Sequence, residues 1–283
     1  MSIESQEYKR PGLQREMKPQ PVSIAQDYRP SKRLENKVAI ITGGDSGIGR
    51  AIALHYASES ISALFLTCTP SEKEDMEECI REIKKINTFT KVETWYGDFA
   101  RDRVEEVVEK CKERFGRIDI LVSNAAEQFQ ECSVQELDVR RMEHLFRVNV
   151  FPLIRLVKAA EPHMQPNSCV IVTTSVISYK GSSTLLDYAA SKGALVALIR
   201  SLALSLHGKK IRVNGVAPGP IWTPLVSSSL NVKMDEFGTA TPLERCGQPS
   251  EVAPAYVFLA DNSQSSYYTG QVLHPNGGYI VNA

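Results

Sequence analysis

The chain has 283 residues, of which 42% are hydrophobic and 23% are charged. This composition is ordinary for a folded soluble protein, and the length supports a sizeable core in one large domain or two small ones. Lys and Arg total 33, as do Asp and Glu, so the formal net charge is zero. A balanced charge provides no basic surface for nucleic acid, and this excludes that class of partner.

The N-terminal segment, residues 1–33, is polar and contains prolines but no apolar run. It is therefore neither a signal peptide nor a transmembrane segment, and no other stretch has 18 apolar residues in a row. We expect a cytoplasmic protein without a membrane partner. Residues 1–33 are predicted to be an extended arm that is disordered or lies across a neighbouring subunit.

Cysteine and histidine spacing indicates neither a disulfide framework nor a metal site. The six cysteines lie at positions 68, 79, 111, 132, 169 and 246 and never form a CxxC pair. Reduced, partly buried thiols are the favoured interpretation. The five histidines have neither HExxH nor His-x-His spacing, so we predict no metal.

From Lys37 onward, short apolar runs alternate with helical stretches. The predicted strands are 38–41, 63–67, 92–95, 118–122, 170–174, 211–216 and 271–273. The predicted helices are 48–58, 71–86, 103–115, 142–163, 188–206 and 250–259. The strand runs are continuously apolar, which is typical of a parallel sheet covered on both faces. The sequence therefore predicts an α/β fold: one doubly wound Rossmann-type domain, residues 34–283, with a seven-stranded parallel sheet.

Residues 223–247 interrupt this alternation and contain no clear strand. Loops of this length are often active-site lids or binding elements. We therefore predict a substrate lid here.

A glycine-rich turn follows the first strand and opens the first helix. Residues 42–49 read TGGDSGIG, with the spacing Gly-x-x-x-Gly-x-Gly. Glycines permit a tight turn and a close approach of the backbone to a pyrophosphate, and the helix N-terminus supplies amide donors. An isolated glycine cluster can be a tight turn and nothing more. Its place between strand and helix favours nucleotide binding.

The end of the second strand, residues 66–69, has no carboxylate that could bind a ribose 2′-hydroxyl. This favours NADP(H) over NAD(H), although neither 45–46 nor 67–69 supplies an Arg or Lys for a 2′-phosphate. Asp98, after the third strand, is predicted to bond the adenine amino group. The alternative is a cap on the following helix, a position for which Asp102 is better placed.

Tyr188 and Lys192 are four residues apart on a predicted helix, so both side chains can act on the same small volume. A tyrosine with the ordinary pKa of about 10 is a poor acid–base catalyst at neutral pH, but a nearby cation favours its phenolate. Such pairs are also common on solvated helix faces. Ser175 upstream and the glycine-rich turn make a reacting site the better interpretation.

Several motifs occur in a fixed order along the chain. They are Thr42-Gly43-Gly44-Asp45-Ser46-Gly47-Ile48-Gly49, Ser123-Asn124-Ala125-Ala126, Asn149, Ser175, Tyr188-x-x-x-Lys192 and Pro218-Gly219. With this order and spacing, the chain from Leu34 onward resembles the short-chain dehydrogenase/reductase family. The proline-containing arm, followed by Arg33-Leu34-Glu35-Asn36-Lys37, is most similar to the branch of glucose- and general-stress-type dehydrogenases.

The resemblance implies roles for four catalytic residues. Tyr188 would be the general acid for carbonyl reduction, and its phenolate the base in reverse. Lys192 would lower the pKa of Tyr188 and bond the nicotinamide ribose. Ser175 would donate a hydrogen bond to the substrate oxygen as negative charge develops there, and Asn149 would hold a water that connects Lys192 to solvent. Considered alone, Ser175 could simply cap a turn, and the hydrogen bonds of the Asn149 side chain could be made within a helix.

The resemblance and the glycine-rich turn together give a predicted cofactor site. Its residues are Gly43, Asp45, Ser46, Ile48, Gly49, Thr67, Cys68, Asp98, Phe99, Asn124, Ala125, Tyr188, Lys192, Pro218, Gly219, Ile221 and Thr223. The family's Asn-Asn-Ala-Gly ends in Ala126 here, which is expected to be tolerated if the backbone φ at that residue is negative.

The substrate is predicted to bind between residues 127–130, 176–186 and the lid. The apolar candidates there are Tyr179, Leu185, Leu186, Trp222, Leu225 and Phe237. Together with nearby Ser and Gln side chains they select no single substrate beyond a small-molecule carbonyl or alcohol. The resemblance also implies a homo-oligomer, a tetramer or dimer, in which helices 142–163 and 188–206 pack across a two-fold axis.

Three hypotheses of function follow from the sequence. The leading one is an NADP(H)-dependent oxidoreductase that transfers a hydride between nicotinamide and a carbonyl or secondary alcohol. The second keeps the fold and cofactor but performs a non-redox isomerisation or cyclisation. The third is a non-catalytic nucleotide-binding protein. The complete set of Ser175, Tyr188 and Lys192 favours the first.

Overall fold

Seven parallel strands form a single sheet in the order β3-β2-β1-β4-β5-β6-β7. The computed structural model describes residues 11–130, 133–230 and 236–281. The strands are β1 (Val38–Thr42), β2 (Ala63–Cys68), β3 (Lys91–Tyr96), β4 (Ile118–Ser123), β5 (Met164–Thr173), β6 (Arg212–Val216) and β7 (Val272–Leu273). The predicted α/β fold with a seven-stranded parallel sheet is confirmed.

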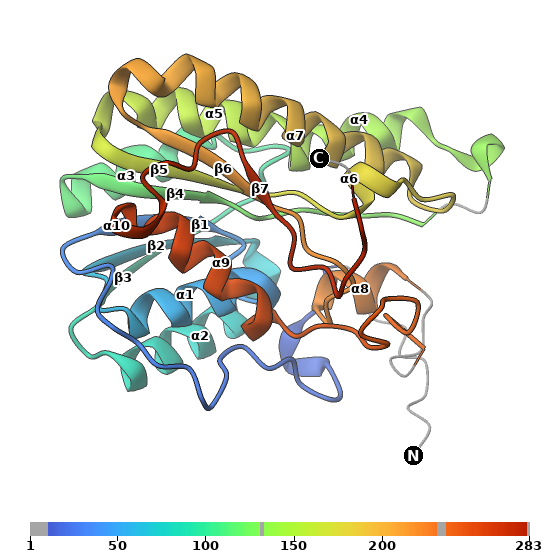
Figure 1. Ribbon diagram of the computed structural model, residues 1–283, viewed down its shortest axis with the longest axis horizontal. Helices are drawn as coiled ribbons and strands as arrows, with labels where there is room; N and C mark the ends of the chain where they lie inside the picture. The colour runs from blue at the N-terminus through green and yellow to red at the C-terminus, as the bar shows by residue number, and fades with distance from the viewer. Residues whose placement is uncertain (1–10, 131–132, 231–235, 282–283) are drawn as a thin grey trace.

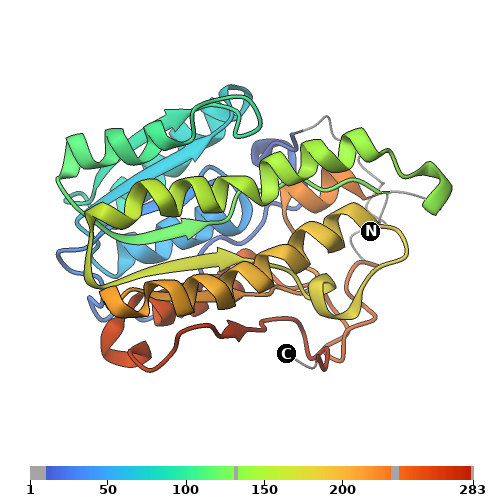
Figure 2. The same cartoon turned by 90° about the horizontal axis from the view of Figure 1, so that it is seen from above.

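Helices cover both faces of this sheet (Figures 1 and 2). They are α1 (Gly47–Ser58), α2 (Lys73–Ile86), α3 (Glu105–Phe115), α4 (Val139–Asn149), α5 (Phe151–Ala160), α6 (Ile177–Lys180), α7 (Leu186–Leu206), α8 (Pro224–Ser229), α9 (Pro249–Ala260) and α10 (Asn262–Ser265). Short 3-10 turns are η1 (Gln14–Glu16), η2 (Pro70–Glu72), η3 (Val134–Glu136), η4 (Glu161–His163) and η5 (His207–Lys209).

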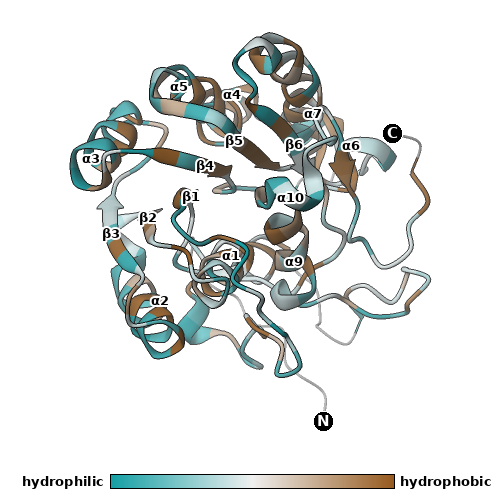
Figure 3. Cartoon of the chain, turned by 60° about the vertical axis from the view of Figure 1, so that its left-hand side comes forward, coloured by the Kyte–Doolittle hydropathy of each residue, from teal (hydrophilic) through white to brown (hydrophobic). Residues whose placement is uncertain are grey.

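Two hydrophobic layers hold the helices on the sheet. One layer joins α1, α2 and α9 to one face, and the other joins α3, α5 and α7 to the opposite face. Because successive strand side chains point to opposite faces, Ile41 of β1 belongs to the first layer and Ile40 to the second. Both are fully buried, and each stabilises the fold by about 1.5–3 kcal/mol relative to an exposed side chain. Figure 3 shows the hydrophobic colour on the central strands.

The strand order reverses between β1 and β4. In open α/β sheets, ligands bind in the crevice outside the carboxyl ends of the strands at such a point. The fold therefore places the ends of β1, β4 and β5 around the expected site.

The helix predicted over 142–163 is two helices, α4 and α5, so that boundary was wrong. Val150 separates them, with φ −113° and ψ −54°. Pro152 has no N–H and cannot donate to the carbonyl of Val148 four residues earlier, which explains the interruption. Asn149 is thereby the last residue of α4 and is buried.

Residues 11–33 pack on the domain of their own chain, an arrangement that neither sequence-based alternative described. The buried carboxylate of Glu59 anchors this arm. It accepts hydrogen bonds from the Tyr28 hydroxyl at 2.5 Å and from the N–H groups of Ser31 and Arg33 at 2.9 and 3.0 Å. Burial alone would raise the pKa of Glu59, but these hydrogen bonds lower it below its ordinary value.

The predicted lid begins with α8 and closes on itself at its ends. The N–H of Gly247 donates to Pro220 O at 2.9 Å, and the N–H of Trp222 donates to Gly247 O at 3.0 Å. Residues 231–235 of the lid lie outside the described residues. These two hydrogen bonds join the chain at the two ends of the predicted lid.

One helical stretch, Leu186–Lys209, is long and apolar enough to be compared with a membrane span. In the fold it packs against β6, α4 and α6, and it buries the charged side chains of Asp187 and Lys192 inside the domain. These contacts are those of a core helix of the domain.

The five described cysteines are free thiols, and Cys132 lies outside the described residues. Cys68, Cys79, Cys111 and Cys169 are buried, and burial raises the pKa of each, to about 11 in Cys169. Within the described part of the chain, no three His, Cys, Asp or Glu side chains are grouped to hold a metal ion.

Candidate active site

A cavity of about 670 Å³ lies at the carboxyl ends of the strands. It is lined by the segments that follow β1, β2, β4, β5 and β6, by the lid, and by two residues of the arm. Every residue predicted from the sequence for catalysis or cofactor binding lines it, except Gly49 and Asn149. The volume is within the ordinary range of ligand and cofactor sites.

The reacting end of the cavity contains Tyr188, Ser175 and Lys192, all of them nearly fully buried. Tyr188 and Lys192 lie one turn apart on α7, with Lys192 Nζ 5.5 Å from the centroid of the Tyr188 ring. Lys192 Nζ donates to Thr173 O at the end of β5, at 2.9 Å. Ser175 follows β5, and its hydroxyl accepts the N–H of Ile177 at 3.2 Å.

Burial is the main influence on the acid–base groups at this end. It raises the pKa of Tyr188 above the ordinary value of 10, while a hydrogen bond with Ser175 acts in the opposite direction. Burial lowers the pKa of Lys192 to about 7, because a low-dielectric site disfavours the ammonium. The expected lowering of the Tyr188 pKa by Lys192 is therefore not the dominant effect. The Tyr188 phenol is therefore protonated at neutral pH and can serve as a proton donor.

Asn149 does not line the cavity but holds its wall together. Its Nδ2 donates to Glu127 O at 2.9 Å and to Ser191 Oγ at 3.1 Å, and its Oδ1 accepts the N–H of Glu127 at 2.9 Å. Ser191 Oγ in turn donates to Tyr188 O at 2.8 Å. Asn149 thus joins the end of α4, the loop after β4 and the turn of α7 that carries Tyr188. Its role in holding a water stays a prediction.

The nucleotide end is formed by the glycine-rich turn between β1 and α1. A side chain on Gly49 would place its Cβ 1.7 Å from Gly43 O, so the two halves of the turn touch. Gly43 has φ +64°, which L side chains rarely adopt. Both positions therefore need glycine, and Gly47 and Ile48 at the N-terminus of α1 line the cavity.

Two carboxyl groups lie beside this turn. Asp45 is buried and lines the cavity, and its Oδ2 has no hydrogen-bond partner among the described residues. Glu72 also lines the cavity, and its Oε2 accepts the N–H of Thr69 at 2.9 Å and the Thr69 hydroxyl at 2.7 Å. Burial raises the pKa of both carboxyl groups.

Sequence reasoning missed Glu72, because it considered only the tip of β2. The capping-box pattern of Thr69-Pro70-Ser71-Glu72 was a usable signal, since it predicts that the glutamate folds back onto the strand end. The structure therefore places a carboxyl group near the tip after all.

Asp98 lines the cavity but is also held by its own loop. Its Oδ1 accepts the N–H of Ala100 at 2.8 Å, and its Oδ2 lies 3.3 Å from Arg101 Nε. Helix α3 begins at Glu105 with Val104 as its N-cap residue. Asp98 is therefore not a helix cap, and neither is Asp102, which had been expected to be one. The contact of Asp98 with adenine stays a prediction.

Asn124 joins three strand ends beneath the cofactor side of the cavity. Its Nδ2 donates to Thr42 O at 3.1 Å, and its Oδ1 accepts the hydroxyl of Thr173 at 3.1 Å. The N–H groups of Asn124 and Ala125 both donate to the Thr42 hydroxyl. Ala126, where the family has glycine, is not among the residues with positive φ, so its side chain is accommodated.

Three of the six apolar candidates for the substrate end line the cavity, namely Leu185, Leu225 and Phe237. The other three do not. Tyr179 packs edge-on against His274, and Trp222 Nε1 donates to Pro19 O of the arm at 2.9 Å. Lys180, within the predicted range 176–186, and Tyr279, which the sequence did not predict, contribute to the wall as a cation–π pair.

Comparison with known proteins agrees with this geometry. The family model described as enoyl-(acyl carrier protein) reductase matches residues 43–280. The chain is 48% identical to NADPH-dependent aldehyde reductase 1, chloroplastic, of Arabidopsis thaliana, over 100% of this chain and 99% of that protein.

Two crystal structures are also similar. A short-chain dehydrogenase/reductase, glucose/ribitol dehydrogenase, from Brucella melitensis has a TM-score of 0.78 and 33% identity over 88% of this chain and 99% of that one. A short-chain dehydrogenase from Burkholderia cenocepacia, in complex with NADP, has a TM-score of 0.78 and 28% identity over 87% of this chain and 98% of that one.

Proposed function

The chain belongs to the short-chain dehydrogenase/reductase family of oxidoreductases, and we propose that it is an NADP(H)-dependent carbonyl reductase with Tyr188 as the general acid. In the reverse direction it would oxidise the corresponding alcohol. The observation that supports this best is the joint burial of Tyr188, Ser175 and Lys192 at one end of a cavity that also contains the glycine-rich turn.

The residues around the turn fit a dinucleotide. The unpartnered Asp45 Oδ2 is a buried polar atom at the cavity wall, and a ribose hydroxyl is the kind of group that would satisfy it. The N-terminus of α1, which lines the cavity, suits a pyrophosphate. When bound, the nicotinamide would supply or accept the hydride.

The side chains at the reacting end would handle the proton. Tyr188, protonated because burial raises its pKa, would give its proton to the carbonyl oxygen of the substrate. The Ser175 hydroxyl would donate a hydrogen bond to the same oxygen. Lys192 has a pKa of about 7, so it would hold a proton below that pH and could pass one toward Tyr188 near neutrality.

NADP(H) is proposed as the cofactor on two grounds. The names of two similar proteins specify NADPH or NADP, and β2 itself ends without a carboxylate. Asp45 and Glu72 would repel a 2′-phosphate if ionised. Burial raises the pKa of both, and a protonated carboxyl group can instead donate a hydrogen bond to a phosphate oxygen.

The proposed substrates are small aldehydes and open-chain sugars. A relative is named an aldehyde reductase and a structural neighbour a glucose/ribitol dehydrogenase. The substrate end of the cavity combines apolar Leu185 and Leu225 with polar Gln128 and Lys180. Such a wall can contact both an apolar chain and hydroxyl groups.

A homo-oligomer and a cytoplasmic location are further parts of the proposal. Leu204 on α7 and Phe151 and Ile154 on α5 are apolar side chains with 76%, 50% and 43% of their surface exposed. Pairing of these helices across a two-fold axis would bury them. Sedimentation of the purified protein tests this, and a monomer at micromolar concentration would contradict it.

A cofactor-oxidation screen tests the proposed function. Aldehydes, ketones, sugars and quinones are offered with NADPH and, separately, with NADH. We expect turnover of an aldehyde or sugar, with higher kcat/KM for NADPH. Product formation without a change in cofactor absorbance would favour the non-redox hypothesis, and binding of NADPH without turnover of any carbonyl would favour the non-catalytic one.

A further inference from the structure

The N-terminal arm reaches the glycine-rich turn. Gln14 is only 3% exposed, and its Oε1 accepts the N–H of Gly47 at 2.7 Å. Gly47 is the first residue of α1, and the first bond within that helix runs from the N–H of Arg50 to Ser46 O. The N–H groups before Arg50 have no acceptor inside the helix. Gln14 accepts that of Gly47, and Ile48, the next residue, lines the cavity.

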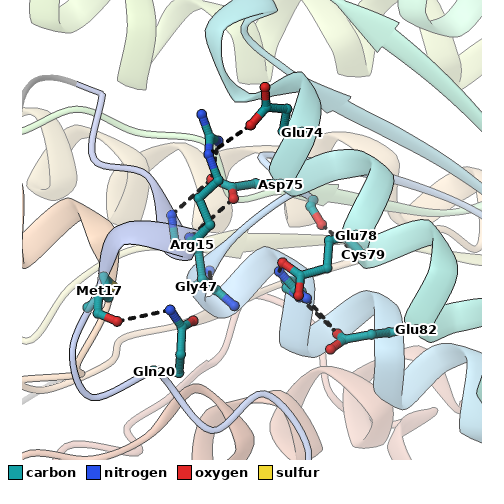
Figure 4. A network of polar contacts seen from close by, with 12 residues as sticks. Arg15, Met17, Gln20, Gly47, Glu74, Asp75, Glu78, Cys79 and Glu82 are labelled. Atoms are coloured by element: carbon teal, nitrogen blue, oxygen red, sulfur yellow. Dashed lines mark hydrogen bonds and ion pairs between the residues drawn. The ribbon is translucent and has the colours of Figure 1, made fainter.

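Gln14 is held in place by α2. The buried carboxylate of Asp75 accepts the N–H of Gln14 at 2.9 Å and the N–H of Arg15 at 3.2 Å. Arg15 lies between Glu74 and Asp75 and pairs with both (Figure 4). The backbone of the arm is therefore fixed at the point from which the Gln14 side chain extends to the turn.

The same segment also touches the lid. Pro11 and Gly12 line the cavity, and a Cβ on Gly12 would lie 2.4 Å from Pro224 O and 2.9 Å from Ser228 Cβ of α8. Trp222, just before α8, donates its Nε1–H to Pro19 O. Within eight residues, the arm thus joins the turn after β1, helix α2 and the start of the lid.

We propose that residues 11–19 are a part of the cofactor site and that Gln14 is a positioning residue for it. By capping Gly47 and resting against α8, the arm holds the N-terminus of α1 and helix α8 in place at the wall of the cavity. Docking of the arm and binding of NADP(H) would then stabilise each other. The inference rests on the proposed function, since it needs the cavity to bind a dinucleotide.

If residues 11–19 of the arm only stabilised the fold, the loss of their contacts would have a different effect. That loss would lower the stability of the free protein and of the cofactor complex equally, and the dissociation constant for NADPH would not change. Coupling is reciprocal: if the docked arm raises NADPH affinity by some factor, bound NADPH favours docking of the arm by the same factor, so undocking the arm must weaken NADPH binding. Cofactor affinity therefore separates the two roles.

The first test compares glutamine-to-alanine changes at two positions of the arm. Gln14→Ala removes the cap on Gly47, whereas Gln20→Ala removes a part-buried bond of the Gln20 side chain to Met17 O, within the arm itself. We expect the Kd for NADPH, measured by its fluorescence, to rise roughly five- to tenfold in Gln14→Ala, which corresponds to a loss of about 1.0–1.4 kcal/mol of binding free energy. It should be unchanged in Gln20→Ala.

Gly12→Ala gives a second route to the same result, because it displaces the arm from α8 without touching the cap on Gly47. Hydrogen–deuterium exchange of the arm in the wild-type protein gives a measurement that does not depend on catalytic turnover. We expect uptake in residues 11–19 to fall when NADP⁺ binds, and this protection to be lost in Gln14→Ala.

Equal NADPH affinity in wild type, Gln14→Ala and Gly12→Ala, with no NADP⁺-dependent protection of the arm, would overturn the inference and leave the proposed function intact. Failure of the wild-type protein to bind NADPH or NADH at all would overturn the proposed function itself.

Discussion

The two ends of the cavity are built in different ways. At the reacting end, Tyr188 and Lys192 come from a single turn of α7, and Ser175 lies two residues after the end of β5. At the nucleotide end, Gln14, Asp45 and Glu72 come from three separate segments that only the fold brings together. The difference teaches that a local motif fixes the chemistry, whereas cofactor binding depends on tertiary contacts.

The charges at the two ends differ as well. The reacting end buries the side-chain amine of Lys192, and burial lowers the pKa of Lys192 to about 7. The nucleotide end gathers carboxyl groups, and burial raises the pKa of Asp45 and Glu72. Changes at the reacting end should therefore affect kcat most, and changes at the nucleotide end should affect cofactor affinity.

The largest effect is expected from Tyr188→Phe, which removes the phenolic proton but keeps the ring. We predict that kcat for carbonyl reduction falls about a thousandfold, within the range for loss of a general acid. The Kd for NADPH should stay within about twofold, because an isosteric change in a packed site is tolerated. Tyr179→Phe, a neighbouring tyrosine outside the cavity lining, is the matched control and should keep its activity. Equal activity of both variants would contradict the assignment.

An intermediate effect is expected from Lys192→Met on the pH dependence of stability. The pKa of Lys192 is about 7 in the fold and 10.5 ordinarily, so between these values the folded state binds fewer protons than the unfolded state. Wild-type stability should therefore rise with pH, relative to the variant, by about 1.4 kcal/mol per unit above pH 7. Below pH 7 the difference should be constant.

Urea unfolding at pH 6, 7 and 8.5 measures this difference. The matched control is Lys112→Met, which changes an exposed lysine of α3. A Lys192→Met protein whose stability followed the same pH dependence as wild type would show that Lys192 is not a buried, shifted group.

The smallest effect is expected from Glu72→Gln at the nucleotide end. Because burial raises the pKa of Glu72, its charge and its repulsion of a 2′-phosphate appear as the pH rises. The wild-type Kd for NADPH should therefore weaken as the pH rises, by about threefold, which is under 1 kcal/mol. Glutamine keeps the capping box but stays neutral, so Glu72→Gln should lose this pH dependence. Glu77→Gln on the exposed face of α2 should retain it, and NADH binding should change less in all three proteins.

The sequence predicted the sheet, the helices that cover it and the reacting end, because each depends on local patterns. Continuous apolar runs indicated buried parallel strands, and the i, i+4 spacing placed Tyr188 and Lys192 on one face of a helix. The helix interruption at Val150 was also readable in principle, since Pro152 cannot donate a backbone hydrogen bond.

The nucleotide end was harder to predict because its contacts span long sequence separations. Gln14 meets Gly47 and Asp75, 33 and 61 residues away, and no periodic pattern encodes such a pairing. Trp222 was predicted to face the substrate, yet its indole N–H is satisfied by Pro19 of the arm. The direction of the Tyr188 pKa shift also depended on burial, which the spacing of two residues cannot reveal.

Transfer of a labelled hydride tests the central claim most directly. A reducible aldehyde or sugar is incubated with the enzyme and with NADPH that carries deuterium at the transferable C4 position, in ordinary water. The account predicts one deuterium per turnover at the carbinol carbon of the product, with matching oxidation of the cofactor. A product without deuterium, or product formed while NADPH remains reduced, would contradict it.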